Sequence, residues 1–85
     1  MSSALTPPAA ELDACGQRCP LPVIRLGARL NELPPGAEVV LLATDPAARS
    51  DVPAFCRMRG HELVSVEDRP AGDAPAHTAY RVRRG

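Results

Sequence analysis

The 85 residues are enough for one domain with one modest core, and a hydrophobic content of 45% permits independent folding. Ten arginines balance ten Asp and Glu residues, so the formal net charge is zero and the overall field does not attract a nucleic-acid backbone. The chain has no apolar run long enough to span a membrane, and its first residues lack the basic and apolar segments of a signal peptide. We therefore expect a cytoplasmic protein that does not bind membranes.

The first half of the chain predicts a tail, a strand and a helix. Residues 1–9 are rich in Ser, Ala and Pro and predict a flexible N-terminal tail before a single domain over residues 10–85. Residues 10–14 indicate a weak strand. Apolar residues at helical spacing predict a helix over residues 20–33, which the following Pro-Pro-Gly sequence ends.

The second half predicts three strands and one helix. The continuous apolar run at 38–43 is typical of a buried strand. Residues 51–59 predict a helix with Ser50 or Asp51 as its N-cap and Pro53 in its first turn. Residues 61–67 predict a third strand. After a loop at 69–76, residues 77–83 alternate like a strand, with Thr78, Tyr80 and Val82 on one face and Ala79, Arg81 and Arg83 on the other.

These elements give the order β-α-β-α-β-β. Two crossover helices between short strands predict an α/β two-layer sandwich, with a mixed four-stranded sheet and both helices on one face. The other face of the sheet would be partly open, which makes it a candidate docking surface. We expect the last strand, beginning at His77, to be edge-like and His77 to be exposed.

The stretch Cys19-Pro20-Leu21-Pro22 marks the predicted start of the first helix. Proline suits the first turn of a helix, and with Cys19 as N-cap the N–H groups of Leu21 and Val23 would lie near its sulfur. Together with the helix dipole, these donors would lower the pKa of Cys19 and favour a thiolate that can carry sulfur as a persulfide. Arg18 and Arg25 would add positive charge if they fold back. The alternative is a structural cysteine at a strand-to-helix turn.

The chain resembles the TusA/SirA/YedF family of small sulfur-carrier proteins. The resemblance rests on an ordered set of short matches: Leu12-Asp13, Gly16, Cys19-Pro20-Leu21-Pro22-Val23, Leu30, Gly36, Asp45-Pro46, Asp51-Val52-Pro53, Phe55-Cys56 and Gly60-His61-Glu62-Leu63. It implies the same two-layer fold and a persulfide on Cys19. It also implies a cysteine desulfurase or rhodanese-like donor and an acceptor protein in tRNA thiolation, sulfur oxidation or related sulfur trafficking. We expect a carrier without turnover of its own, and no metal or cofactor beyond the covalent sulfur.

Two residues depart from the family pattern. Gln17 stands where the family usually has an apolar residue, and Arg25 stands where a Lys is common.

Cys15, His61 and Asp45 each have more than one interpretation. Cys15 is either an incidental turn residue or a resolving thiol for Cys19, and as half of a metal site it gives only a weak signal. His61 either forms a hydrogen bond that stabilises a loop or acts as a general acid. Asp45 supplies turn and cap chemistry or, as a minority interpretation, contacts a partner. Cys56 is expected to be a small buried hydrophobe.

The main alternative function is a regulatory or RNA-associated module that uses the open sheet face and the basic cluster of Arg81, Arg83 and Arg84. The same cluster could be a solvated strand face or bind an acidic partner. Phe55 and Tyr80 are the only aromatic residues, so few side chains can stack on bases. We therefore expect no tight binding of nucleic acid.

Overall fold

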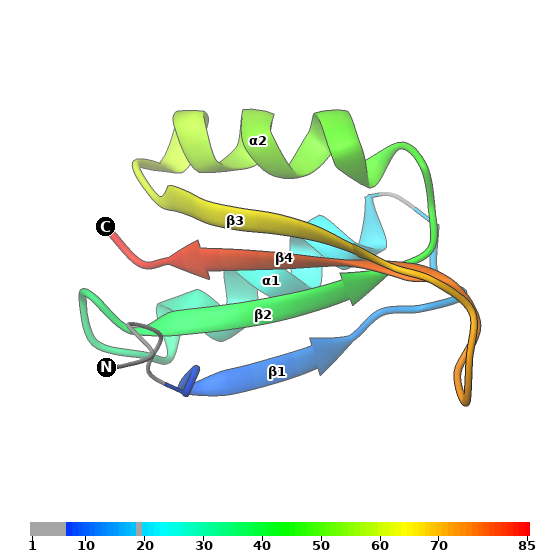
Figure 1. Ribbon diagram of the computed structural model, residues 1–85. Coiled ribbons are helices and arrows are strands. Elements are labelled where there is room, and N and C mark those ends of the chain that lie inside the picture. The colour runs from blue at the N-terminus through cyan, green and yellow to red at the C-terminus, as the bar shows by residue number, and fades with distance from the viewer. Residues whose placement is uncertain (1–6, 19) are drawn as a thin grey trace.

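The structure is a computed structural model that describes residues 7–18 and 20–85. It confirms the predicted β-α-β-α-β-β order and the two-layer α/β architecture (Figure 1). The elements are β1 (Ala10–Asp13), α1 (Leu21–Asn31), β2 (Glu38–Ala43), α2 (Ala48–Arg59), β3 (Glu62–Arg69) and β4 (His77–Arg83). The predicted tail at residues 1–9 lies mostly outside the described residues. At its end, the Ala9 N–H donates to the Glu38 carbonyl over 2.7 Å and continues the pairing of β1 with β2.

The sheet is mixed, with the strand order β1-β2-β4-β3. Strands β1 and β2 are parallel, and β4 is antiparallel to both of its neighbours, β2 and β3. The expectation that residues 77–83 form an edge-like strand is therefore wrong. The crossover through α2 leaves a space beside β2, and β4 turns back from β3 to fill it. His77 is correspondingly half-buried rather than exposed.

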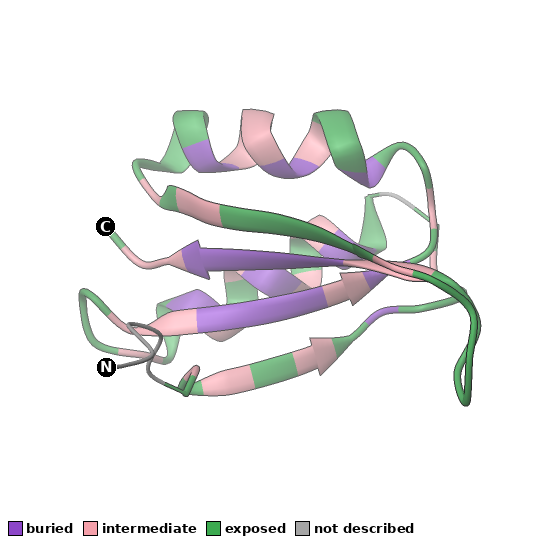
Figure 2. Ribbon diagram, viewed as in Figure 1, coloured by how far each residue is buried: buried purple, intermediate pink, exposed green. Residues whose placement is uncertain are grey.

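The core lies between the sheet and the two helices. Alternate residues of the two central strands face the helices. The sequence predicted this alternation for residues 77–83 and a continuous buried strand for residues 38–43, and Figure 2 shows the buried residues concentrated on β2 and β4. The core residues of these strands and of the helices are Val39, Leu41, Ala43, Tyr80 and Val82 with Leu26, Leu30, Ala48, Val52 and Cys56. Burial of each large aliphatic side chain contributes about 1.5–3 kcal/mol. This packing holds the helix starts against the strand ends.

Helix α2 begins earlier than the sequence pattern indicated. Its N-cap is Ala47, so the prediction of Ser50 or Asp51 as N-cap is wrong. Asp45 explains the earlier start, because its Oδ1 accepts the Ala47 N–H over 3.0 Å and its carbonyl accepts the Ala48 N–H over 3.1 Å. These bonds satisfy two donors that would otherwise be unpaired at the helix start.

Pro53 consequently lies inside α2 and not in its first turn, contrary to the prediction. Proline has no N–H to donate to the carbonyl of residue 49, and its ring crowds that carbonyl. The apolar side of the helix compensates for this local defect, since Val52 and Cys56 are both buried in the core.

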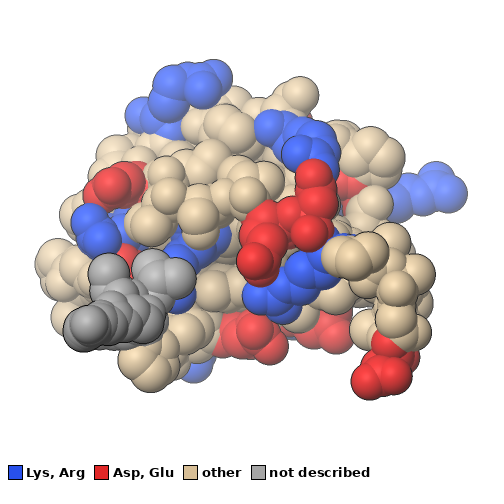
Figure 3. All heavy atoms as spheres, in the orientation of Figure 1, with Lys and Arg blue, Asp and Glu red and all other residues tan. Residues whose placement is uncertain are grey.

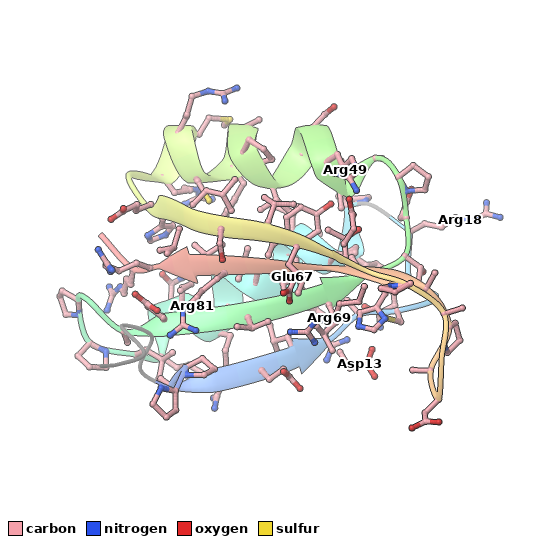
Figure 4. The ribbon with its side chains drawn as sticks, in the orientation of Figure 1. Asp13, Arg18, Arg49, Glu67, Arg69 and Arg81 are labelled. Carbon is pink, nitrogen blue, oxygen red and sulfur yellow. The ribbon has the colours of Figure 1, made fainter. Side chains whose placement is uncertain are left out.

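The sheet face opposite the helices carries a network of ion pairs. Glu38 accepts hydrogen bonds from Arg81 and, over 2.8 Å, from Arg83, which also pairs with Glu62 over 2.9 Å. Figure 3 shows basic and acidic side chains next to one another on this face, and Figure 4 places Arg81 there together with Arg69 and Glu67. Arg81 is 9% exposed, so the interpretation of a solvated strand face is wrong for this residue.

Candidate functional site

The candidate site lies at the edge of the sheet where β1 and β2 end and both helices begin. Parallel strands bring their carboxyl ends to the same edge, and each crossover helix starts from that edge. Residues 14–18 connect the end of β1 to the start of α1. They lead directly to the Cys-Pro-Leu-Pro stretch.

Backbone hydrogen bonds fix this connecting loop to the sheet. The Ala14 N–H donates to the Leu42 carbonyl over 2.8 Å, and the Gly16 N–H donates to Thr44 Oγ1 over 2.8 Å. The Cys15 N–H donates to Asp13 Oδ1 over 3.0 Å. Gly16 has φ +83°, a left-handed conformation that glycine adopts without a steric penalty. The loop therefore has a defined path although most of it is exposed.

Sequence reasoning missed Thr44 and Asp13 as site residues. Thr44 directly follows a buried strand, and Asp13 ends the strand parallel to it. Both positions were predicted to lie near strand ends, so the shared edge was the available signal. What the sequence did not show is that each side chain would accept a backbone N–H of the loop.

Arg25 fixes the same loop from the helix side. Its guanidinium donates to the Asp13 carbonyl and to Gln17 Oε1, each over 3.0 Å. Gln17 and Arg25, the two residues expected from the sequence to depart from the family pattern, are thus hydrogen-bonded to each other. Arg18 is exposed, and Figure 4 shows its side chain extending away from the body of the protein.

Helix α1 begins with Pro20 as its N-cap, which corrects the prediction of Cys19 at that position. Cys19 itself lies outside the described residues. The Leu21 N–H donates to the Arg18 carbonyl over 2.9 Å, so it is not one of the free donors that the sequence predicted. Pro22 is buried and has no N–H, and the Ile24 N–H donates to the Pro20 carbonyl over 3.0 Å.

The two described cysteines have thiols that resist ionisation. Cys15 is exposed, but partial desolvation of its thiol is the first cause that raises its pKa, and the hydrogen bond and negative charge of Asp13 raise it further. Burial alone raises the pKa of Cys56, which is 3% exposed, as expected of a small core residue. Because the thiolate is the reactive form, both cysteines are poor nucleophiles at neutral pH. For Cys15 this favours the incidental turn residue over the resolving thiol.

His61 lies beyond the C-terminal end of α2, whereas the candidate site lies at the N-terminal ends of the helices. Its Nδ1 accepts the Gly85 N–H over 3.0 Å, and its ring packs against Phe55 with a centroid separation of 5.6 Å. Burial, followed by the charges of Arg84 and Arg59, lowers the pKa of His61. This geometry favours the stabilising hydrogen bond over the general acid.

The basic cluster near the C-terminal end is occupied by internal contacts. Arg81 and Arg83 pair with Glu38, and Arg84 donates to the Leu33 carbonyl. These guanidinium groups have little capacity left to neutralise phosphates, which weakens the RNA-associated alternative. Among the described residues, no helix is long and apolar enough to cross a bilayer, and no group of three potential metal-ligating side chains is close enough to hold an ion.

Comparisons with known proteins place the chain beside a family of sulfur carriers. Residues 10–82 match the family described as Sulfurtransferase TusA. The chain is similar to the "Sulfur carrier protein TusA" of Pseudomonas syringae, with 50% identity over 58 residues that cover 68% of this chain and 69% of the relative. It is 46% identical to the protein of the same name in Pseudomonas fluorescens over 57 residues, which cover 67% of this chain and 69% of the relative. Among solved structures, a SirA-like protein of Desulfitobacterium hafniense has a TM-score of 0.65 and 27% identity, covering 89% of this chain and 99% of that one.

Proposed function

Since the chain belongs to the TusA family, we propose that it carries sulfur as a persulfide on Cys19 and relays it between partner proteins. The observation that carries the proposal is the family match over residues 10–82, because it includes the Cys-Pro-Leu-Pro stretch. The raised pKa values of Cys15 and Cys56 support the choice of Cys19 among the three cysteines.

The first turn of α1 provides the local chemistry. A helix N-terminus carries partial positive charge, and two of its residues, Pro20 and Pro22, have no N–H. The Val23 N–H is the backbone group that we expect to stabilise a negative sulfur at residue 19. A lower pKa of Cys19 would follow, and the fraction of reactive thiolate at neutral pH would rise.

Sulfur transfer then needs no oxidant or reductant. The Cys19 thiolate attacks the outer sulfur of a donor persulfide, a new S–S bond forms, and the donor's S–S bond breaks. The donor cysteine leaves as a thiolate, and Cys19 keeps the outer sulfur with its proton as Cys–S–SH. The same exchange in the opposite sense delivers the sulfur to an acceptor cysteine.

The expected donor is a cysteine desulfurase or a rhodanese-like protein, and the expected acceptor is a relay protein in tRNA thiolation, sulfur oxidation or related sulfur trafficking. The protein would act in the cytoplasm and have no turnover alone, because each loading event requires a donor and each release requires an acceptor. No metal or organic cofactor enters this chemistry.

Intact-mass measurement after incubation with a cysteine desulfurase and cysteine tests the proposal. The wild-type protein should gain the mass of one sulfur atom, and a reducing thiol should remove it. Cys19→Ser should abolish the gain. Cys15→Ser and Cys56→Ser serve as matched controls and should still be loaded. Loading of Cys19→Ser to the wild-type level would refute Cys19 as the carrier.

A further inference from the structure

A groove runs between α1 and α2 from the candidate site to the far end of the helices. Two adjoining hollows of about 370 and 380 Å³ form it, and they share Val23, Phe55 and Arg59 as lining residues. Pro20 lines one end of the groove and His61 the other. The groove therefore begins beside the residue that follows Cys19 in the chain.

Gly27 permits the close approach that forms the floor of this groove. A Cβ atom at residue 27 would lie 3.2 Å from Cζ of Phe55, so the ring packs directly against the backbone of α1. Glycine inside a helix is less favourable than alanine. The glycine lies at the point where the Phe55 ring contacts the α1 backbone.

The rim of the groove carries large apolar side chains that are exposed to solvent. Ile24 is 58% exposed and Met58 is 81% exposed, and Leu21 next to Pro20 is 51% exposed. Val66, on β3, is the one other large hydrophobic residue with comparable exposure in the part of the chain that the structure describes. Clustered apolar exposure on a soluble protein is typical of a surface that contacts another protein.

Charge is divided between the two layers, although the chain as a whole is neutral. The helices carry five arginines and one aspartate, a net charge of +4, whereas the strands carry six carboxylates and three arginines, a net charge of −3. Arg29 and Arg49 pair with Glu32 and Asp68, and Arg25 binds the loop. Arg59 lines both hollows. Among the described residues, no carboxylate lies within ion-pair distance of its guanidinium.

We propose that this groove docks the sulfur donor protein through a segment that combines apolar side chains with a carboxylate. The apolar side chains would fill the hollows between Ile24, Phe55 and Met58, and the carboxylate would pair with Arg59. Complementary charge also orients an approaching partner toward the positive helical layer. This inference rests on the proposed function, since it assigns the partner that reaches residue 19.

The test measures how much cysteine desulfurase is needed for half-maximal loading of Cys19 in the presence of cysteine. Arg59→Glu and Met58→Glu should raise that concentration at least tenfold, equivalent to about 1.4 kcal/mol. Arg57→Glu, on the same helix but outside both hollows, and Val66→Glu, on β3, are the matched controls. Each should change the concentration less than about twofold, a difference below about 0.4 kcal/mol. The effect of Arg59→Glu should shrink at high salt, because screening weakens the repulsion.

Loading by inorganic polysulfide separates docking from the chemistry of Cys19. This small donor needs no groove, so every variant should be loaded by it as fast as the wild-type protein. Equal loading of Arg59→Glu, Met58→Glu and wild type by the desulfurase would overturn the docking proposal. The docking proposal would also be overturned if polysulfide loads the wild-type protein but the desulfurase does not. A third contrary result would be groove variants that are loaded normally and impair only the delivery of sulfur to an acceptor. Failure of polysulfide to load Cys19 would instead count against the proposed function.

Discussion

Arg25 and Gln17 join helix α1 to the loop that precedes the candidate site, through a hydrogen bond of 3.0 Å between the guanidinium and Oε1. The same guanidinium nitrogen donates to the Asp13 carbonyl, so a single side chain connects the end of β1, the loop and the helix. Both residues were expected from the sequence to depart from the family pattern, and this contact gives the pair a structural role. A guanidinium can donate to several acceptors at once, whereas an ammonium is a compact point charge.

Arg25→Ala should loosen the loop without unfolding the protein. Loss of two hydrogen bonds from a charged donor is expected to cost about 1–2 kcal/mol. Hydrogen exchange at the amides of Gly16 and Gln17 should become faster. Arg29→Ala is the matched control on the same helix, because its ion pair with Glu32 is exposed and contributes less than about 1 kcal/mol. Unchanged amide exchange in Arg25→Ala would show that the sheet contacts alone hold the loop.

Cys15 and Cys19 should differ in reactivity, although they are close in sequence. The alkylation rate of Cys15, measured against pH with Cys19 and Cys56 replaced by Ser, should have its inflection above that of a free thiol. Asp13→Asn should lower that inflection only part of the way, because burial remains after the charge is removed. Glu11→Gln, an exposed residue of the same strand, is the control.

For Cys19 the inflection of the alkylation rate is expected below the free-thiol value, and an equal or higher value would contradict the electrostatic role of the helix start.

The ion pairs of Glu38 should make the free energy of unfolding depend on pH in the acidic range. Hydrogen bonds from Arg81 and then from Arg83 are the main causes that lower the pKa of Glu38 below its ordinary value. A carboxyl group whose pKa is lower in the folded state stabilises the protein above its unfolded pKa. That stabilisation is lost as the pH falls through the folded pKa. The free energy of unfolding in urea should therefore decrease on acidification.

Glu38→Gln should weaken this pH dependence and destabilise the protein by about 2 kcal/mol at neutral pH, because it removes the carboxylate that pairs with the buried Arg81 charge. The matched control is Glu67→Gln, whose pair with Arg69 is exposed and is expected to contribute less than about 1 kcal/mol. Equal effects of the two substitutions would mean that burial adds nothing to the Glu38 network.

The fold could be predicted because its signals are local. The apolar run at residues 38–43 and the alternation at residues 77–83 depend only on neighbouring residues, and both strands are present. The strand order could not be predicted in the same way. The insertion of β4 between β2 and β3 depends on contacts between residues far apart in the chain, and nothing in the alternation of residues 77–83 distinguishes a central strand from an edge strand.

The start of the first helix was predicted in outline and corrected in detail. The Cys-Pro-Leu-Pro stretch does begin a helix, because proline fits a position without an intrahelical acceptor. The N-cap and the bonded state of the Leu21 N–H depend on the conformation of a turn, which the sequence does not specify. The pairing of Arg81 with Glu38 was also unpredictable, since 43 positions separate the two residues and only the sheet register brings them together.

Pro53→Ala should stabilise the protein, because the structure places this proline inside α2 rather than in its first turn. Alanine would restore an N–H for the carbonyl of residue 49 and remove the crowding by the ring. The helix would gain up to about 3 kcal/mol in intrinsic propensity, offset by up to about 1 kcal/mol because the unfolded chain becomes more flexible. The net gain of about 2 kcal/mol should raise the melting temperature by roughly 8–16 °C in a domain of this size. Pro46→Ala is the control, since Pro46 lies before the helix and its replacement changes only the unfolded chain. Scanning calorimetry decides the outcome: a Pro53→Ala protein no more stable than wild type would mean that packing of the proline ring outweighs the missing hydrogen bond.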